Sequence, residues 1–196
     1  MGPYPLYLLW AAQLARTVAG APFAGPFLAY VDKFSRCADD ESTNRILMTM
    51  TITPFNIREP YALQIVNGKL SFNRTFDDTY WTRTRIDSRS TDGHRWMKNA
   101  FLFNFPSKGC SVFREQAPDW YRVLLGDVIT SGKECTVPPG VYPIEKQSVN
   151  WTFPNVPIMP YGFMRFHSTF GRARETDFCF QAEFHSIPRP KPGNIG

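Results

Sequence analysis

Hydrophobic and polar residues alternate along much of the chain, and a period of two indicates strands with one buried face. In residues 46–53 every second residue is apolar, and most of the residues between them are threonines. Similar alternation predicts strands at 80–87, 98–105, 148–153, 162–169 and 175–185. About seven or eight strands separated by turns are typical of an all-β, immunoglobulin-like two-sheet β-sandwich.

Two stretches carry a different signal. Asn67-Gly68 separates two further alternating stretches, and this dipeptide favours the tight turn of a β-hairpin. In residues 118–130, apolar residues recur at helical spacing after a proline that suits a first helical turn. We therefore expect a hairpin with arms 61–66 and 69–76, and one short amphipathic helix.

Composition agrees with a turn-rich β protein. The 196 residues include 17 prolines, 13 glycines and 17 phenylalanines, which suits one domain with a large aromatic interior. The net charge is +5, but basic and acidic residues are interleaved and no nucleic-acid-binding motif occurs. We therefore expect no nucleic-acid partner.

The N-terminus resembles a secretory signal. The apolar run 6–15 is too short to span a bilayer, and small residues follow it. We expect a signal peptide at 1–20, cleaved after Gly20, and a secreted, extracellular domain at 21–185. A retained apolar helix or an uncleaved anchor is the alternative. The Pro-rich stretch 186–196 is expected to be a disordered tail.

Cysteines and sequons point to the same compartment. Four cysteines in an exported chain predict two disulfides, with three connectivities open. Asn73 and Asn150 each begin an Asn-x-Thr sequon, and both fall on the predicted outward face of a strand, so we expect glycosylation there.

No pattern of catalytic or metal-ligating residues occurs. The sequence has no nucleophile elbow, HExxH, P-loop or dinucleotide fingerprint, and His94 has no evident catalytic partner. The acidic clusters 39–41 and 77–78 lack the spacing of a calcium loop. We therefore expect no enzyme, no metal and no cofactor, and a hydrolase that uses His94 is the weakest alternative.

The predicted inward faces are rich in Met, Phe and Trp. Such side chains either interdigitate as an ordinary core or line an apolar cavity between the sheets, and a continuous void of roughly 300–1,000 Å³ would indicate a cavity. The candidate lining residues are Met48, Met50, Phe72, Trp81, Phe101, Phe103, Trp151, Met164 and Phe166. A basic run that includes Arg83, Arg85 and Arg95 is a candidate rim for an anionic headgroup, with a solvated strand face as the alternative.

The C-terminal half carries a resemblance to a known family. Cys135, Pro139-Gly140-Val141-Tyr142, Val149-Asn150-Trp151, Pro154-Asn155-Val156-Pro157 and Pro160-Tyr161-Gly162-Phe163-Met164-Arg165 follow one another in order. This order resembles the arthropod ML-like branch of the lipid-recognition (ML) superfamily, akin to the ganglioside activator protein and the fly chemosensory ML-like proteins. The match extends over roughly Cys37 to Phe184. It departs from the family pattern at residue 136, which is Thr in place of Pro.

The resemblance implies a sandwich whose sheets separate to admit acyl chains. It also implies the disulfides Cys37–Cys179 and Cys110–Cys135. The expected function is a secreted lipid-binding or lipid-transfer protein, whose partner is a lipid or another small apolar ligand. The alternative is an extracellular interaction or chemosensory accessory module with a closed core and a cell-surface receptor as partner.

Overall fold

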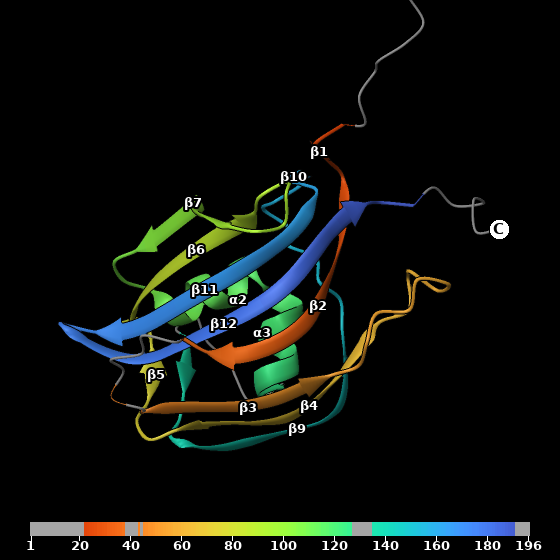
Figure 1. Cartoon of the computed structure of the whole chain (residues 1–196). Helices are drawn as coiled ribbons and strands as arrows, with labels where there is room; N and C mark the ends of the chain where they lie inside the picture. Colours follow the sequence, from red (N-terminus) through yellow and green to blue (C-terminus); the bar gives the residue numbers. More distant parts are fainter. Residues whose placement is uncertain (1–21, 38–42, 44, 127–134, 191–196) are drawn as a thin grey trace, which may run out of the picture.

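The computed structural model describes residues 22–37, 43, 45–126 and 135–190 (Figure 1). Its strands are β1 (Ala24–Gly25), β2 (Phe27–Arg36), β3 (Ile46–Ile52), β4 (Gln64–Phe72), β5 (Phe76–Asp77), β6 (Trp81–Arg89), β7 (Trp96–Phe105), β8 (Thr136–Val137), β9 (Gly140–Val149), β10 (Met159–Pro160), β11 (Gly162–Arg172) and β12 (Glu175–Pro188). Its helices are α2 (Gly109–Gln116) and α3 (Pro118–Leu125). The all-β prediction is therefore confirmed, with one more short helix than the pattern predicted.

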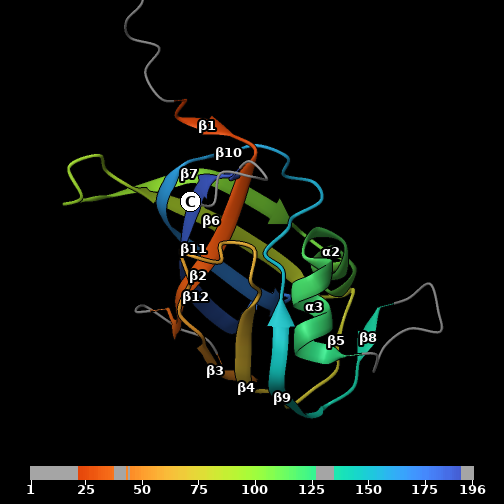
Figure 2. The ribbon, with the colours of Figure 1, turned by 90° about the vertical axis from the view of Figure 1, so that its right-hand side faces the viewer.

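Two antiparallel sheets face each other. One has five strands in the order β2-β12-β11-β6-β7, and the other has three in the order β3-β4-β9. The pairs β1-β10 and β5-β8 form two small additional sheets. Figure 2 shows α3 beside β9, and the two elements are in contact, so the helices fill one side of the space between the sheets.

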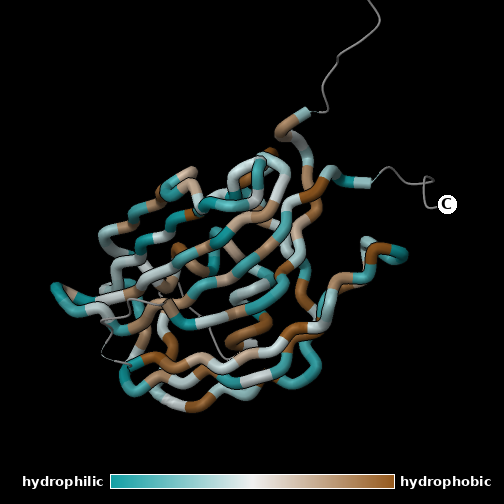
Figure 3. Tube along the Cα trace, in the orientation of Figure 1, coloured by the Kyte–Doolittle hydropathy of each residue, from teal (hydrophilic) through white to brown (hydrophobic). Residues whose placement is uncertain are grey.

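Hydropathy alternates along the strands, as Figure 3 shows, and the turn between β11 and β12 is hydrophilic. The buried apolar residues form two clusters, one between the small sheet, the helices and the end of the large sheet, and one around β2, β11 and β12. Phe34, Ile52, Trp151 and Phe166 pack against both clusters and so join them into one interior.

The predicted hairpin at Asn67-Gly68 is wrong. Both residues lie inside β4, the central strand of the small sheet, which pairs with β3 on one side and β9 on the other. The register with β9 shifts between Val66 and Gly68, where Glu145 and Lys146 of β9 lie opposite Asn67 alone, so β9 carries a bulge at this point. A Cβ on Gly68 would lie 2.1 Å from the carbonyl oxygen of Thr49, so close strand pairing requires this glycine. Tertiary pairing therefore outweighs the local turn preference.

The residue that precedes α2, Lys108, does not cap the helix with its side chain. The carboxylate of Asp78 instead accepts hydrogen bonds from the Ser111 N–H at 2.8 Å and from the Ser111 hydroxyl at 2.7 Å. This cap comes from a residue distant in sequence, and it explains why local signals did not reveal the helix start. The predicted helix at 118 does begin at Pro118, and it ends at Leu125; residues 127–130 lie outside the described part.

Two strand ends differ from the prediction. Strand β9 ends at Val149, so residues 150–153 are not a strand, although Asn150 is exposed and Trp151 half-buried as the alternation predicted. Strand β12 continues to Pro188 and buries Ser186, so the predicted disordered tail is wrong for residues 186–188. Pairing of Ser186 with Ala29 of β2 explains this extension.

Both expected disulfides are present, Cys37–Cys179 and Cys110–Cys135. The first joins β12 to the end of β2, and the second joins α2 to the residue before β8. No described helix is long and apolar enough to span a membrane. The predicted signal peptide at 1–20 lies outside the described residues.

Candidate functional site: an apolar cavity beneath the large sheet

An apolar cavity of about 190 Å³ lies against the inner face of the five-stranded sheet. Its lining comes from β2, β6, β7, β11 and β12, from both helices and from residues 151–159. No described residue of β3, β4 or β9 lines it. The cavity therefore lies between the large sheet and the helices, and not between the two sheets as expected. It is also smaller than the predicted range of volumes.

The floor of the cavity is a grid of side chains set by strand pairing. The central row consists of four residues at paired positions on β7, β6, β11 and β12, which are Phe103, Thr84, Ser168 and Phe180. One neighbouring row contains Phe105, Thr82 and Phe170, and the other contains Phe101, Ile86, Phe166 and Ala182. The floor is thus a small hydroxyl-bearing centre with aromatic rings around it.

The roof is built from aromatic rings of three segments. The Trp120 ring on α3 stacks on Phe34 of β2 at a centroid distance of 5.2 Å, and it packs against Trp151 at 5.0 Å. Phe113 and Val112 of α2 extend the roof toward β7. Because α3 itself packs on β9 and β4, the helices separate the cavity from the small sheet.

A buried glutamine holds the roof in place. The Gln64 side chain accepts hydrogen bonds from the Val31 N–H at 2.8 Å and the Trp151 indole N–H at 2.9 Å. Its amide donates to the carbonyls of Val31 at 2.8 Å and Thr53 at 2.7 Å. Gln64 therefore links the two sheets and orients Trp151. The only sequence signal for Gln64 is a lone glutamine in an apolar run, which does not predict this role.

The cavity opens beside β7. Phe101 and Phe103 line it and are 36% and 39% exposed, and Ile158, which also lines it, is 60% exposed. β7 is the edge strand of the large sheet, and Leu102, which alternates with the two phenylalanines, is also exposed. The solvent-exposed part of the lining therefore lies on β7 and at Ile158.

Four of the nine predicted lining residues do line the cavity, namely Phe101, Phe103, Trp151 and Phe166. Met48 and Met50 on β3 and Phe72 on β4 pack instead in the cluster between the small sheet and the helices. Met164 is buried beside β2 and β12. Met48, Met50 and Phe72 lie outside the lining because they belong to the small sheet, whereas Met164 is on the large sheet but packs in the cluster with Phe27 and Val31.

Trp81 was also expected in the cavity, but it lies on the opposite face of β6. The cavity receives Thr82, Thr84 and Ile86, so strand alternation turns Trp81 outward. The Trp81 indole packs over Gly171 and donates a hydrogen bond to the Ala173 carbonyl at 3.1 Å. The guanidinium of Arg83 stacks on the Trp81 ring at 4.9 Å.

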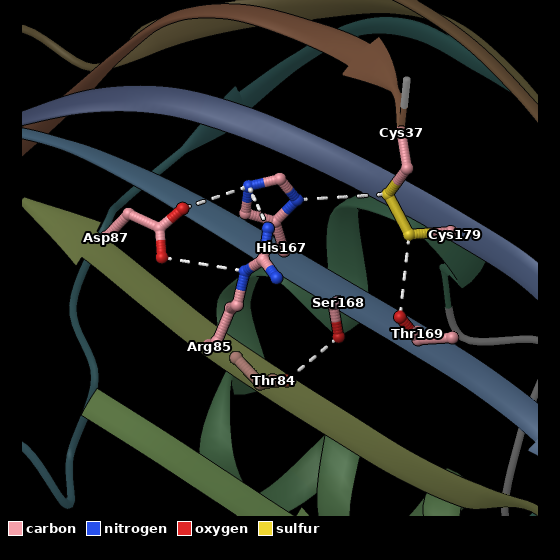
Figure 4. Close-up of a disulfide and its surroundings, with 8 residues drawn as sticks. All are labelled: Cys37, Thr84, Arg85, Asp87, His167, Ser168, Thr169 and Cys179. Atoms are coloured by element: carbon pink, nitrogen blue, oxygen red, sulfur yellow. Dashed lines mark hydrogen bonds and ion pairs between the residues drawn. A yellow bond between two sulfur atoms is a disulfide. The ribbon is translucent and has the colours of Figure 1, made fainter. Parts of the chain in front are cut away.

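The predicted cationic rim is not at the mouth. Arg83 and Arg85 share the outer face of the sheet with Trp81, and Arg95 is exposed in the turn before β7. Arg85 belongs to a network around the buried carboxylate of Asp87 (Figure 4). In that network Arg165 donates to Asp87 at 3.0 Å, and His167 Nε2 lies 3.3 Å from the same oxygen. These charged groups interact with one another on the outer face of the sheet, away from the cavity.

The network fixes two protonation states. Burial raises the pKa of the Asp87 carboxyl, but the Asn99 N–H and the Arg165 guanidinium outweigh burial and hold its pKa below the usual range. Burial, together with the positive charges of Arg85 and Arg165, lowers the pKa of His167 to about 4, although Asp87 opposes this shift. His167 is therefore neutral at physiological pH.

The two sequon asparagines, Asn73 and Asn150, are both exposed. Asn73 follows β4 and Asn150 follows β9, so neither lies within a strand as predicted. His94 is exposed in the turn before β7, where its backbone N–H donates to Asp92. Among the described residues, no cluster of His, Cys, Asp and Glu has the arrangement of a metal site.

No protein-family model and no curated protein matches the sequence. The cavity, its aromatic lining and its open edge are therefore the observations on which a function can be argued.

Proposed function

We propose that this chain is a secreted protein that binds one small apolar ligand in the cavity beneath the five-stranded sheet. The observation that carries this proposal is an open cavity of about 190 Å³ whose described lining contains no charged side chain. Apolar pockets with few polar groups are typical of carriers of apolar molecules. No covalent chemistry is proposed, because the hydroxyls of Thr82, Thr84 and Ser168 have no general base beside them among the described lining residues.

The volume sets the size of the ligand. At about 30 Å³ for each water-sized group, 190 Å³ holds roughly six methylene-sized groups. At about 0.8 kcal/mol for each buried CH₂, six groups contribute roughly 5 kcal/mol, equivalent to a dissociation constant near 0.3 mM. A longer acyl chain gains affinity by extending along Phe101 and Phe103 at the mouth.

The proposal places the protein outside the cell. Two disulfides suit an oxidising compartment, and both sequon asparagines are exposed and accessible to glycosylation. The apolar run at 6–15 provides the secretory signal.

The resemblance to the ML superfamily supports the same proposal. Both disulfides have the pairing that the resemblance implies, and the segment 151–159, which contains part of the resembling motif, forms a wall of the cavity. We therefore propose an ML-like lipid-binding or lipid-transfer protein, with a ligand small enough for a single narrow cavity.

The test is titration of the secreted protein with the small apolar probe ethylbenzene, followed by nuclear magnetic resonance. The wild type is expected to show saturable chemical-shift changes. The substitution Ala182→Phe fills the floor between Phe166 and Phe34 and is expected to abolish binding, with the fold checked by circular dichroism. Ala100→Phe, on the outer face of β7, is the matched control and is expected to bind normally. Equal binding by both variants, or no binding by the wild type, contradicts the proposal.

A second candidate is a protein-interaction module. β7 is an edge strand, and Met97 and Leu102 on it are 52% and 67% exposed, so this edge could pair with a partner. This candidate predicts that the wild type takes up no probe and that Leu102→Lys reduces binding of the secreted protein to cell surfaces.

A further inference from the structure

We infer that the ligand is uncharged and carries an oxygen function that meets a cluster of three hydroxyl groups on the cavity floor. The inference rests on the proposed function and specifies the chemistry of its ligand. The cluster consists of Thr82 and Thr84 on β6 and Ser168 on β11, and we call it the hydroxyl cluster.

The hydroxyl cluster is the polar part of the sheet floor. Apart from Gln116, which also bonds to Asn155 at 3.1 Å, and the indole N–H groups of Trp120 and Trp151, the three hydroxyl residues are the only polar side chains among the described lining residues. Strand pairing places Thr84 opposite Ser168 and Thr82 opposite Phe170. Phenylalanines of β7, β11 and β12 surround the three hydroxyls, so a ligand that covers the aromatic rings also covers the hydroxyl cluster.

The hydroxyls have hydrogen-bonding capacity to spare. Thr84 Oγ1 and Ser168 Oγ lie 2.9 Å apart and form one mutual hydrogen bond, as Figure 4 shows. That bond uses one of their two hydroxyl protons, so the other proton remains available as a donor. Thr82 is 4% exposed, and its Oγ1 has no hydrogen-bond partner among the described residues.

An unpaired buried hydroxyl is costly, and that cost indicates a ligand. A polar group buried without a partner loses its hydration and gains nothing in return. If the cavity held no polar group of a ligand, valine at position 82 would pack equally well and would not bury an unpaired hydroxyl. Rotation about χ1 exchanges the methyl and hydroxyl groups of Thr82, so an oxygen of a bound molecule can become the partner of this hydroxyl.

The charge of the ligand follows from the same lining. None of the described lining residues is ionisable. Arg83 and Arg85 lie on the other face of the sheet, and Arg95 lies in the turn before β7. An ionised carboxylate or phosphate would be buried there without a counter-charge, which is far more costly than burying a neutral oxygen. The matching class is therefore an alcohol, aldehyde, ketone or ester on an apolar body.

The test compares three small rigid probes of similar size by nuclear magnetic resonance titration: ethylbenzene, benzyl alcohol and benzoate at pH 7. All three fit an apolar cavity of this class, since a cavity of about 150 Å³ accepts benzene. We expect ethylbenzene and benzyl alcohol to bind and benzoate to show no saturable shifts. Benzoate affinity equal to that of benzyl alcohol would overturn the claim of a neutral ligand.

Variants then test the hydroxyl cluster. Thr82→Val, and separately Thr84→Val with Ser168→Ala, are each expected to weaken benzyl alcohol binding by about fivefold, the worth of one hydrogen bond, and to leave ethylbenzene binding unchanged or tighter. Thr169→Val, on the opposite face of β11, is the matched control and is expected to change neither affinity.

The outcomes separate this inference from the proposed function. If ethylbenzene and benzyl alcohol both bind and no variant changes the ratio of their affinities, the inference is wrong and the proposed function stands. If neither probe binds the folded wild type, both are wrong. Two independent sets of variants keep the result decisive if one of them fails to fold.

Discussion

Single residues in this molecule are often set by neighbours that are distant in sequence. Gly68 is the clearest case, because its backbone φ of 153° and its contact with Thr49 leave no room for a side chain. The sequence correctly predicts that this glycine matters, but it assigns the wrong reason. The exposure of Asn73 and Asn150 was predicted from alternation. The Asp78 cap on α2, in contrast, depends on a tertiary contact that no local pattern contains.

Replacing Gly68 by alanine is expected to destabilise the protein. The new Cβ would lie 2.1 Å from the Thr49 carbonyl oxygen, so the pairing of β3 with β4 must shift. We expect the free energy of unfolding to fall by about 2 kcal/mol or more in urea denaturation. Ser71→Ala, one residue from the end of β4, is the control and should change it by less than about 0.5 kcal/mol. An unchanged midpoint for Gly68→Ala would contradict the close approach of β3 to Gly68.

His167 is expected to make stability depend on pH. Its pKa in the fold, about 4, is below the usual 6.5, so the unfolded chain binds a proton that the folded chain does not. Stability is therefore lost as pH falls from 6.5 toward 4, by about 2–3 kcal/mol at pH 4.5. Urea denaturation at pH 7 and pH 4.5 measures this loss.

The variant His167→Gln should remove most of that pH dependence, because glutamine does not titrate. His94→Gln, in an exposed turn, should retain it. If both variants behave alike, the proton does not come from His167.

At the scale of elements, strands with strict alternation were predictable and the elements that shape the cavity were not. The face of β12 that carries Phe178, Phe180, Ala182 and Phe184 is buried as the pattern predicted. The helix α2 was missed, although Cys110, Phe113 and Ala117 have helical spacing. Because no helix was predicted at 109–116, the sequence placed the cavity between the two sheets. For this reason Met48, Met50 and Phe72 of β3 and β4 were expected in its lining.

Gln64 links the elements that enclose the cavity. Gln64→Leu would leave the Val31 N–H, the Trp151 indole N–H and two carbonyl groups without partners. We expect a loss of about 2–4 kcal/mol in unfolding free energy, and weaker binding of ethylbenzene because Trp151 is no longer held. Gln147→Leu, at a position whose amide bonds only to the nearby Glu145 carbonyl, should have little effect on either quantity. Tight probe binding by Gln64→Leu would show that the roof does not depend on this residue.

The two disulfides should differ in their contribution to stability. Cys37–Cys179 joins residues 142 apart and Cys110–Cys135 joins residues 25 apart. Loop-closure entropy assigns them roughly 5 and roughly 3.5 kcal/mol. Thermal unfolding of the two double-serine variants should rank them in this order, and the reverse order would show that native contacts of the short loop dominate.

At the scale of the whole molecule, sequence patterns predicted a β-sandwich with two disulfides and an aromatic interior. They did not predict how that interior divides, because the division depends on where the helices dock. The large sheet and the helices enclose a cavity with an open edge at β7, while the small sheet packs densely against the other side of the helices. The ligand that we propose would occupy this cavity and leave the small sheet untouched.

Native mass spectrometry of the chain, expressed by secretion from eukaryotic cells, tests the account most directly. The account predicts a complex of the protein with one small neutral apolar molecule, lost after organic extraction and restored by adding the extract back. Ala182→Phe, expressed in the same way, should retain nothing. A wild-type protein that appears only as the bare chain, and that takes up no added apolar probe, would contradict the claim that this cavity is a binding site.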